Sequence, residues 1–317
     1  MPLFVQATDS PAVTIRANGL SRRFGTHAAV DGIELQLRRG EVLGFLGPNG
    51  AGKTTTMQML TGNLAPTAGS VSICGVDLLE TPVQAKSHIG YLPETPPLYR
   101  DLNVTEYLDL AARLHRVAKA RRTAAIDLAC QRCGLGDVRR KLIGALSKGF
   151  QQRVGIAQAI VHEPDVIILD EPTVGLDPNQ IREIRALIRE LGSAHSVILS
   201  THILPEVEAI CDRVQIMHHG KMVYADTIAG LKQIRRTLVV ELKQPPQSTD
   251  LLAITGVTHV EPAGENLFLV RIAADNDPTE RIVALAAERQ WGLRQIGPAQ
   301  TSLEDVFINL TRRDENG

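Results

Sequence analysis

One stretch near the start of the chain fits the pattern G-x-x-x-x-G-K-[ST]: Gly47-Pro48-Asn49-Gly50-Ala51-Gly52-Lys53-Thr54. It follows residues 41–46, which we predict to be an apolar strand, and it opens a predicted helix over residues 54–60. In that context the glycines let backbone N–H groups turn towards phosphate oxygens, and the helix start adds the positive end of its dipole. Lys53 is then expected to reach the β- and γ-phosphates, and the Thr54 hydroxyl to bind Mg²⁺. The stretch therefore predicts a nucleoside triphosphate site.

A second apolar strand ends in two carboxylates. Residues 166–169 are Val-Ile-Ile-Leu, and Asp170 and Glu171 follow them. In a parallel sheet the carboxyl ends of the strands line the ligand crevice, so both acids are expected beside the phosphates. We predict that Asp170 holds Mg²⁺, directly or through water, and that Glu171 orients or deprotonates the attacking water.

The order of predicted elements indicates an α/β fold. Nearly all-apolar strands alternate with helices, which is typical of a largely parallel sheet covered on both faces. A helical block inserted at about residues 105–160 interrupts this alternation. The predicted strands are residues 13–17, 33–37, 41–46, 89–92, 166–169 and 197–200, with a hairpin over 214–224. We assign residues 13–231 to this first domain.

The character of the sequence changes after about residue 231. Strands are predicted near 237–242, 257–261, 267–272 and 293–296, with helices at 249–254, 279–289 and 302–310. The order βαββαβ is that of a ferredoxin-like domain. We therefore predict a small α+β domain over residues 236–313.

Composition narrows the class of protein. The 317 residues are 44% hydrophobic and 22% charged, with a formal net charge of −1, which argues against a disordered chain and against binding nucleic acid through bulk positive charge. No apolar run approaches the ~18 residues of a membrane span, and residues 1–11 lack the pattern of a secretory signal. Cys130 and Cys133 have C-x-x-C spacing, but their apolar helical context favours buried thiols over a redox or zinc site. These features indicate a reduced, cytoplasmic protein whose membrane role, if any, comes through a partner.

The sequence resembles the ATP-binding subunits of ABC transporters, over about residues 13–231. Five landmarks occur in the family's order: Phe24, where the family has an aromatic ring that stacks on adenine; Gly47 to Thr55, the phosphate loop; Ser147 and Gly149, within a version of the signature that opens Leu-Ser-Gly-Gly-Gln; Asp177, in the loop after the two-carboxylate strand; and His202, the switch histidine. The resemblance implies an ATP hydrolase that uses ATP with Mg²⁺, with Lys53, Glu171 and His202 in its catalytic machinery.

The resemblance also implies a homodimer. Ser147 precedes a predicted helix over 151–161, so it can cap a helix start that binds anionic phosphate. In the family this helix start completes the site of the opposite subunit, so a chain with a single phosphate loop needs a second copy. Two composite ATP-sandwich sites then follow from twofold symmetry.

Two departures from the family pattern indicate a subgroup. Glu94 stands where the family usually has Gln, and it can contact Mg²⁺ or water; Lys148 and Phe150 replace Gly and Gln of the signature. Together with the ending at 302–307, they resemble the ATPases of ABC-2-type exporters, including the gliding-motility-associated branch. The implied partner is an integral membrane permease, with the chain bound at the inner face of the cell membrane and no nucleic acid partner. The alternative is a soluble ABC ATPase in DNA repair or translation.

Overall fold

The computed structural model describes residues 12–230, 237–273 and 276–298. The chain divides into two compact units, Met1–Ala225 and Asp226–Gly317, so the division falls a few residues before the 231–236 interval suggested by the sequence. The predicted helix at 302–310 and the terminal segment 1–11 lie outside the described residues. Within the described ranges, no helix is both long and apolar enough to cross a membrane.

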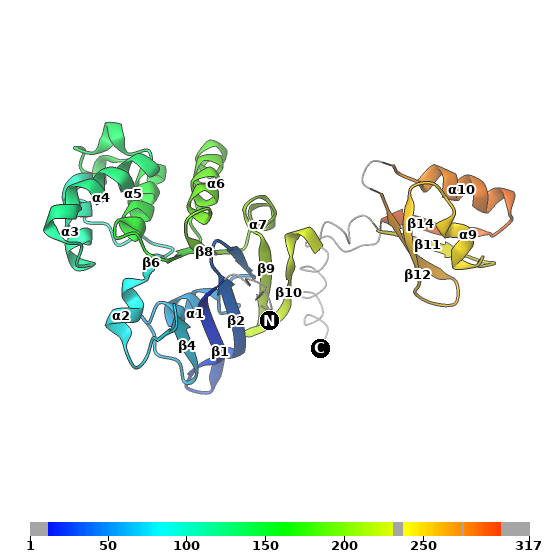
Figure 1. Ribbon diagram of the computed structural model, residues 1–317, viewed down its shortest axis with the longest axis horizontal. Helices are drawn as coiled ribbons and strands as arrows, with labels where there is room; N and C mark the ends of the chain where they lie inside the picture. The colour runs from blue at the N-terminus through cyan, green and yellow to red at the C-terminus, as the bar shows by residue number, and fades with distance from the viewer. Residues whose placement is uncertain (1–11, 231–236, 274–275, 299–317) are drawn as a thin grey trace, which may run out of the picture. The chain divides into compact units, whose positions relative to one another are not determined.

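A six-stranded sheet forms the centre of the first unit (Figure 1). Four neighbouring strands that carry the site run parallel, in the order β3-β8-β7-β6. Every residue of β3, β7 and β8 is buried, as the apolar runs predict. In sheet order the strands are β10 (Lys221–Thr227), β9 (Arg213–His218), β3 (Val42–Leu46), β8 (Ser196–Thr201), β7 (Val166–Asp170) and β6 (Ile89–Leu92).

A second sheet in this unit is antiparallel, with strands β2 (His27–Arg38), β1 (Val13–Phe24), β4 (Ala68–Ile73) and β5 (Val76–Asp77) in that order. Strands β1 and β2 are each 12 residues long, well beyond the predicted 13–17 and 33–37. Register shifts interrupt their pairing and break the alternation that would have indicated their length. Both sheets contribute to one core, in which Ile15, Ile73 and Phe45 are buried together.

Helices cover the parallel sheet or form the inserted block. The helical block predicted at about 105–160 begins with α3 (Val104–Leu114) and α4 (Lys119–Arg132), followed by short 3₁₀ turns at Gly136–Val138 and Ile143–Ala145. In Figure 1 these helices, in green, group with α5 (Lys148–Ile160). The remaining helices of the unit are α1 (Lys53–Leu60), α2 (Pro82–Ser87), α6 (Pro178–Gly192) and α7 (Leu204–Ile210).

The second unit has its own core and its own sheet. Its strands pair antiparallel in the order β12-β13-β11-β14, and its element sequence is βαββαβ. Val240, Val270 and Ile282 are fully buried in it. The elements are β11 (Thr237–Leu242), α9 (Ser248–Leu252), β12 (Val257–Pro262), β13 (Leu267–Ile272), α10 (Thr279–Glu288) and β14 (Leu293–Pro298).

Candidate functional site

The phosphate loop joins β3 to α1 in a shape that requires glycine. Gly52 has φ +104°, and a Cβ there would collide with the carbonyl oxygen of Ala29 and the side chain of Met217. The Lys53 ammonium is buried, with 6% of the residue exposed. It donates to the carbonyl oxygens of Gly47 at 2.8 Å and Pro48 at 3.3 Å. The loop thus holds a cation against its own backbone, at the start of a helix.

Asp170 ends β7 with its carboxylate fully buried, and neither of its oxygens has a hydrogen-bond partner. Burial raises the pKa of Asp170, while the nearby Ser200 and Thr54 hydroxyls act in the opposite direction. A buried carboxylate without a partner is costly, and a bound cation removes that cost. The site therefore fits Mg²⁺, with Asp170 and the Thr54 hydroxyl as the groups available to hold it.

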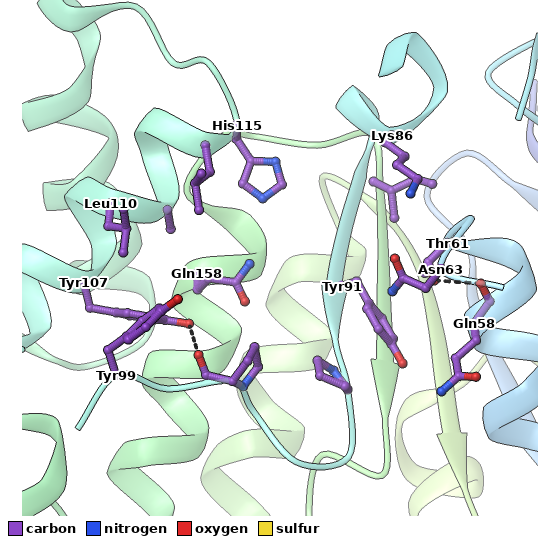
Figure 2. A pocket seen from close by; sticks show the side chains of 15 residues that line it. Gln58, Thr61, Asn63, Lys86, Tyr91, Tyr99, Tyr107, Leu110, His115 and Gln158 are labelled. Atoms are coloured by element: carbon purple, nitrogen blue, oxygen red, sulfur yellow. Dashed lines mark hydrogen bonds between the residues drawn. The ribbon is translucent and has the colours of Figure 1, made fainter. Parts of the chain in front are cut away.

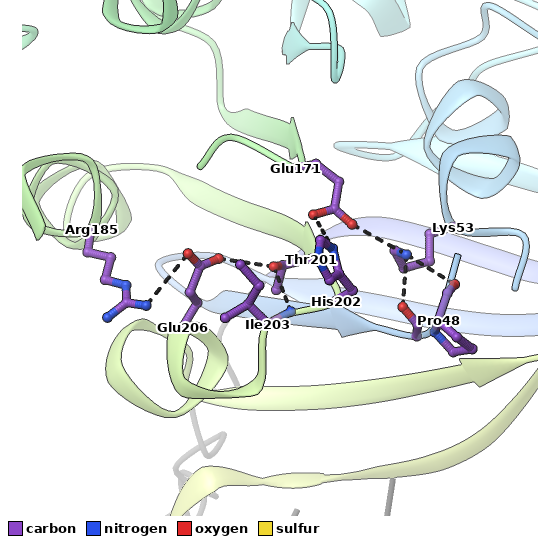
Figure 3. Close-up of polar contacts among 9 residues, drawn as sticks. Pro48, Lys53, Glu171, Arg185, Thr201, His202, Ile203 and Glu206 are labelled. Carbon is purple, nitrogen blue, oxygen red and sulfur yellow. Dashed lines mark hydrogen bonds and ion pairs between the residues drawn. The ribbon is translucent and has the colours of Figure 1, made fainter. Parts of the chain in front are cut away.

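Glu171 connects Lys53 and His202 (Figure 3). Its Oε1 lies 3.4 Å from Lys53 Nζ, and its Oε2 lies 2.9 Å from Nδ1 of His202. Glu171 has φ +50°, a backbone conformation that side chains other than glycine seldom adopt, and its N–H donates to the Ser200 carbonyl at 2.9 Å. This strained turn directs a carboxylate that is only 7% exposed back towards the phosphate loop.

Parallel pairing explains why residues so distant in sequence meet. The phosphate loop, Glu171 and His202 follow the ends of β3, β7 and β8, which are neighbours in the sheet. They share a cavity of about 500 Å³ with Glu94, an exposed residue just beyond β6. The lining residues are His27, Ala29, Asn49, Gly50, Gly52, Lys53, Thr54, Thr55, Glu94, Glu171, Val174 and His202.

Three of these lining residues were missed by the sequence analysis: His27, Ala29 and Val174. His27 and Ala29 belong to β2, in the antiparallel sheet, and Val174 lies in the turn after β7. No local motif marks His27 or Ala29, because they reach the cavity through the packing of one sheet beside the other. Val174 lies between Glu171 and Asp177, so its neighbours in sequence were the available signal.

The remaining predicted site residues do not line this cavity. Phe24 is 49% exposed at the end of β1, with the Arg22 guanidinium 4.8 Å from its ring centroid. Ser147 caps α5 and accepts from the Phe150 N–H at 3.4 Å. Asp177 caps α6, and Gly149 in the first turn of α5 lies close to the Gln180 side chain. Each cap satisfies a backbone N–H group at a helix start, so Ser147 and Asp177 have local structural roles in this chain.

A buried carboxylate outside the predicted set supports the histidine. Glu206 in α7 is fully buried; its Oε2 accepts from the Thr201 hydroxyl at 3.0 Å, and its Oε1 lies 3.6 Å from Arg185 Nη2. The Thr201 hydroxyl in turn accepts from the Ile203 N–H at 3.1 Å (Figure 3). Since Thr201 and Ile203 flank His202, this chain of contacts fixes the backbone that carries the histidine.

We expect the substitution Glu206→Ala to lower the free energy of unfolding by about 2 kcal/mol, because Thr201 and Arg185 lose a buried partner. The turnover number should fall while the KM for ATP changes little, since the cavity lining stays intact. Urea unfolding and steady-state ATPase assays measure both. Glu206→Gln retains an acceptor for Thr201 and should lose less; the exposed Glu190→Ala is the matched control. A Glu206→Ala protein with unchanged stability and turnover would contradict this role.

The phosphate loop, the carboxylates that end β7 and the histidine after β8 define a P-loop nucleoside triphosphatase. The family model described as "ABC transporter" matches residues 30–174, and one described as "AAA domain, putative AbiEii toxin, Type IV TA system" matches 142–207. The bacitracin transport ATP-binding protein BcrA of Bacillus licheniformis is 33% identical over 93% of this chain and 96% of its own. The daunorubicin resistance ATP-binding protein DrrA3 of Streptomyces coeruleorubidus is 32% identical over 95% and 96%.

A solved ATP-binding subunit of an ABC transporter superposes with a TM-score of 0.63 at 31% identity, covering 69% of this chain and 92% of that one. The chain belongs to the family of ABC transporter ATP-binding proteins. Its activity is ATP hydrolysis, and the P-loop fold predicted from the sequence is confirmed. Because the relatives are named for transport and drug resistance, they support the transport function over a soluble role in DNA repair or translation.

Proposed function

We propose that this protein is the ATPase subunit of an ABC-2-type exporter, acting as a homodimer on an integral membrane permease. The observation that carries the proposal is the buried Glu171 carboxylate held between Lys53 and His202 at the mouth of the phosphate loop. The names of BcrA and DrrA3, relatives over nearly the whole of this chain, support export. The second unit is then the additional domain of an exporter-type ATPase. Its strand order supports a ferredoxin-like domain.

In the proposed mechanism each residue has a separate task. The loop from Gly47 to Thr55 binds the phosphates, and Lys53 leaves its carbonyl partners to neutralise the β- and γ-phosphate charge. Thr54 and Asp170, with Glu94 from the segment after β6, would hold Mg²⁺, which would supply charge neutralisation on the phosphate oxygens. Glu171 orients or deprotonates the attacking water, and His202 donates a hydrogen bond to the γ-phosphate.

The dimer accounts for the motif residues that lie away from the cavity. In the proposed ATP-bound pair, Phe24 stacks on adenine, and the α5 start, with Ser147 and Gly149, faces the γ-phosphate bound by the other subunit. Asp177 belongs to the loop next to that contact. In this pair Lys148 adds a positive charge to the contact, which offsets the negative charge that Glu94 brings to the site.

A second cavity is the proposed contact surface for the permease. It measures about 530 Å³ and lies beside β6 and α3, next to the loop that follows Glu94 (Figure 2). Tyr107 donates to the Pro97 carbonyl at 3.2 Å, which ties α3 to that loop, and the neighbouring Tyr99 is 60% exposed. Residues 95–101 connect this cavity to Glu94. A helix of the permease bound here would therefore be coupled to conformational changes at the ATP site.

Trapping the proposed ATP-bound dimer tests whether its partner is a membrane protein. Glu171→Gln, expressed in cells with ATP and extracted from membranes in mild detergent, should co-purify with a polytopic membrane protein in equal amounts. Tyr99→Asp, placed in the same background, should lose that partner because it puts a charge into the proposed contact. Leu79→Asp is the matched control, since Leu79 is 50% exposed and does not line the cavity. Recovery only in the soluble fraction, with ribosomes or DNA-repair factors, would overturn the transport proposal.

A further inference from the structure

Three side chains that bind transition metals meet on the first unit, away from the ATP site. They are Cys74 in the turn between β4 and β5, His88 just before β6, and Asp165 just before β7. One potential ligand atom from each lies within 4.8 Å of the other two, and His88 Nδ1 is 2.7 Å from Asp165 Oδ2. In the part of the chain that the structure describes, this is the one group of three such residues.

Main-chain hydrogen bonds fix the positions of these residues. The Val166 N–H donates to the His88 carbonyl at 3.0 Å, so the starts of β6 and β7 are fixed side by side. The Cys74 N–H donates to the Thr14 carbonyl at 2.7 Å, which anchors the turn to β1. The cluster therefore joins the antiparallel sheet to the first residues of two parallel strands, at the rim of their common core.

Cys74 differs from the other cysteines in both exposure and backbone conformation. Cys130, Cys133 and Cys211 are buried, whereas Cys74 is half-buried and can be reached from solvent. Cys74 and Gly75 form a two-residue turn with φ +50° and +81°, closed by the pairing of Ile73 with Val76. Turns of this type favour Asn, Asp or Gly at the first position, so the geometry of the turn does not explain the cysteine there.

We propose that Cys74, His88 and Asp165 form a binding site for a divalent metal ion of the zinc class. Thiolate sulfur, imidazole nitrogen and carboxylate oxygen are together the donor set that Zn²⁺ takes, and three protein ligands leave the fourth tetrahedral position to water. Cysteine binds zinc as the thiolate, so the ion displaces the Cys74 proton on binding. Mg²⁺ takes oxygen ligands, and only one of these three donors is an oxygen, so the metal preference of this site differs from that of the nucleotide site.

The position of the cluster gives the ion a structural role. His88 and Asp165 precede β6 and β7, whereas Glu94 and Glu171 follow them, so the cluster lies at the edge of the sheet opposite to the catalytic residues. A metal ion here would cross-link the β4–β5 turn to the parallel sheet. We expect it to stabilise the packing of the two sheets and to leave the chemistry at the phosphate loop unaffected.

Cobalt titration of the full chain tests the site, without nucleotide and without Mg²⁺. One equivalent of Co²⁺ should produce thiolate-to-cobalt charge-transfer absorption, and Zn²⁺ should remove it by displacing the cobalt. Cys74→Ser should abolish the band. Asp165→Asn replaces a carboxylate ligand and should therefore weaken Co²⁺ binding by more than the ~10-fold that the loss of an outer-shell partner can cost. Cys130→Ser, which alters a buried thiol outside the cluster, should keep the full band.

Thermal unfolding tests Zn²⁺ binding without relying on the cobalt absorption band. Zn²⁺ should raise the thermal unfolding midpoint of the wild-type chain and of Cys130→Ser, and it should not raise that of Cys74→Ser. An unchanged ATPase rate in Cys74→Ser identifies that variant as folded. The proposal is overturned if excess Co²⁺ gives the wild-type chain no charge-transfer band, or if the band persists in Cys74→Ser.

Discussion

Replacing Glu171 by glutamine should leave ATP binding nearly unchanged and lower the turnover number by roughly 10²- to 10⁴-fold, the range for loss of a general base. Glutamine keeps the size of the side chain and an oxygen that can accept from His202, so the cavity keeps its shape. It cannot take a proton from water, and it removes the negative charge 3.4 Å from Lys53. We expect ATP to bind at least as tightly, because less negative charge then faces the phosphates.

The two halves of this prediction need separate measurements. Equilibrium binding of ATP reports the first, and single-turnover hydrolysis reports the second without a contribution from product release. Glu163→Gln is a matched control, because Glu163 is an exposed partner of Arg121 outside the ATP cavity. Near-normal hydrolysis by Glu171→Gln would remove Glu171 from the proposed mechanism.

The parts of the site that follow strand ends could be predicted from the sequence. Apolar runs identified β3, β7 and β8 as buried strands, and the parallel-sheet rule placed Lys53, Glu171 and His202 at one edge. The structure brings these residues within contact of one another. Each carries a local signal, because motif and strand are adjacent in the chain.

Features that depend on contacts between distant segments could not be predicted in this way. His27 and Ala29 reach the cavity only because the antiparallel sheet packs beside the phosphate loop, and nothing near them in sequence records it. Strand β4 contains Gly69 and two serines, so its pattern gave no strand signal, and its place next to β1 comes from pairing. Glu206 has the same character: its role comes from Thr201 and Arg185, on a strand and a different helix.

The motif residues away from the cavity are a different case. Ser147 and Asp177 were identified by resemblance to a family, and their local roles as helix caps follow from residue type. Their proposed contact with nucleotide requires a second chain, so a single chain cannot contain the complete site. For these residues sequence and fold give the position of each group, and the proposed dimer would supply the ligand contact.

Replacing Lys53 by alanine should weaken ATP binding by at least ~10- to 100-fold, the range for losing hydrogen bonds to a charged group. Lys53 is buried at the start of α1, so its charge is poorly screened where the phosphates bind. Without it, Glu171 keeps only His202 as a partner, and an uncompensated carboxylate faces the incoming phosphates. The substitution therefore removes an attraction and exposes a repulsion at the same position.

The repulsion between Glu171 and the phosphates can be measured in a double-mutant cycle. In the Glu171→Gln background Lys53→Ala should cost less ATP affinity than in the wild-type chain, because the carboxylate that Lys53 offsets is absent. Isothermal titration of all four proteins of this cycle measures the coupling between the two residues. Lys221→Ala, which alters an exposed lysine paired with Asp31, is the control and should bind ATP as the wild type does. If Lys53→Ala binds ATP normally, Gly47 to Thr54 is not a phosphate loop in function, and without it the assignment of Glu171 to the attacking water loses its geometric basis.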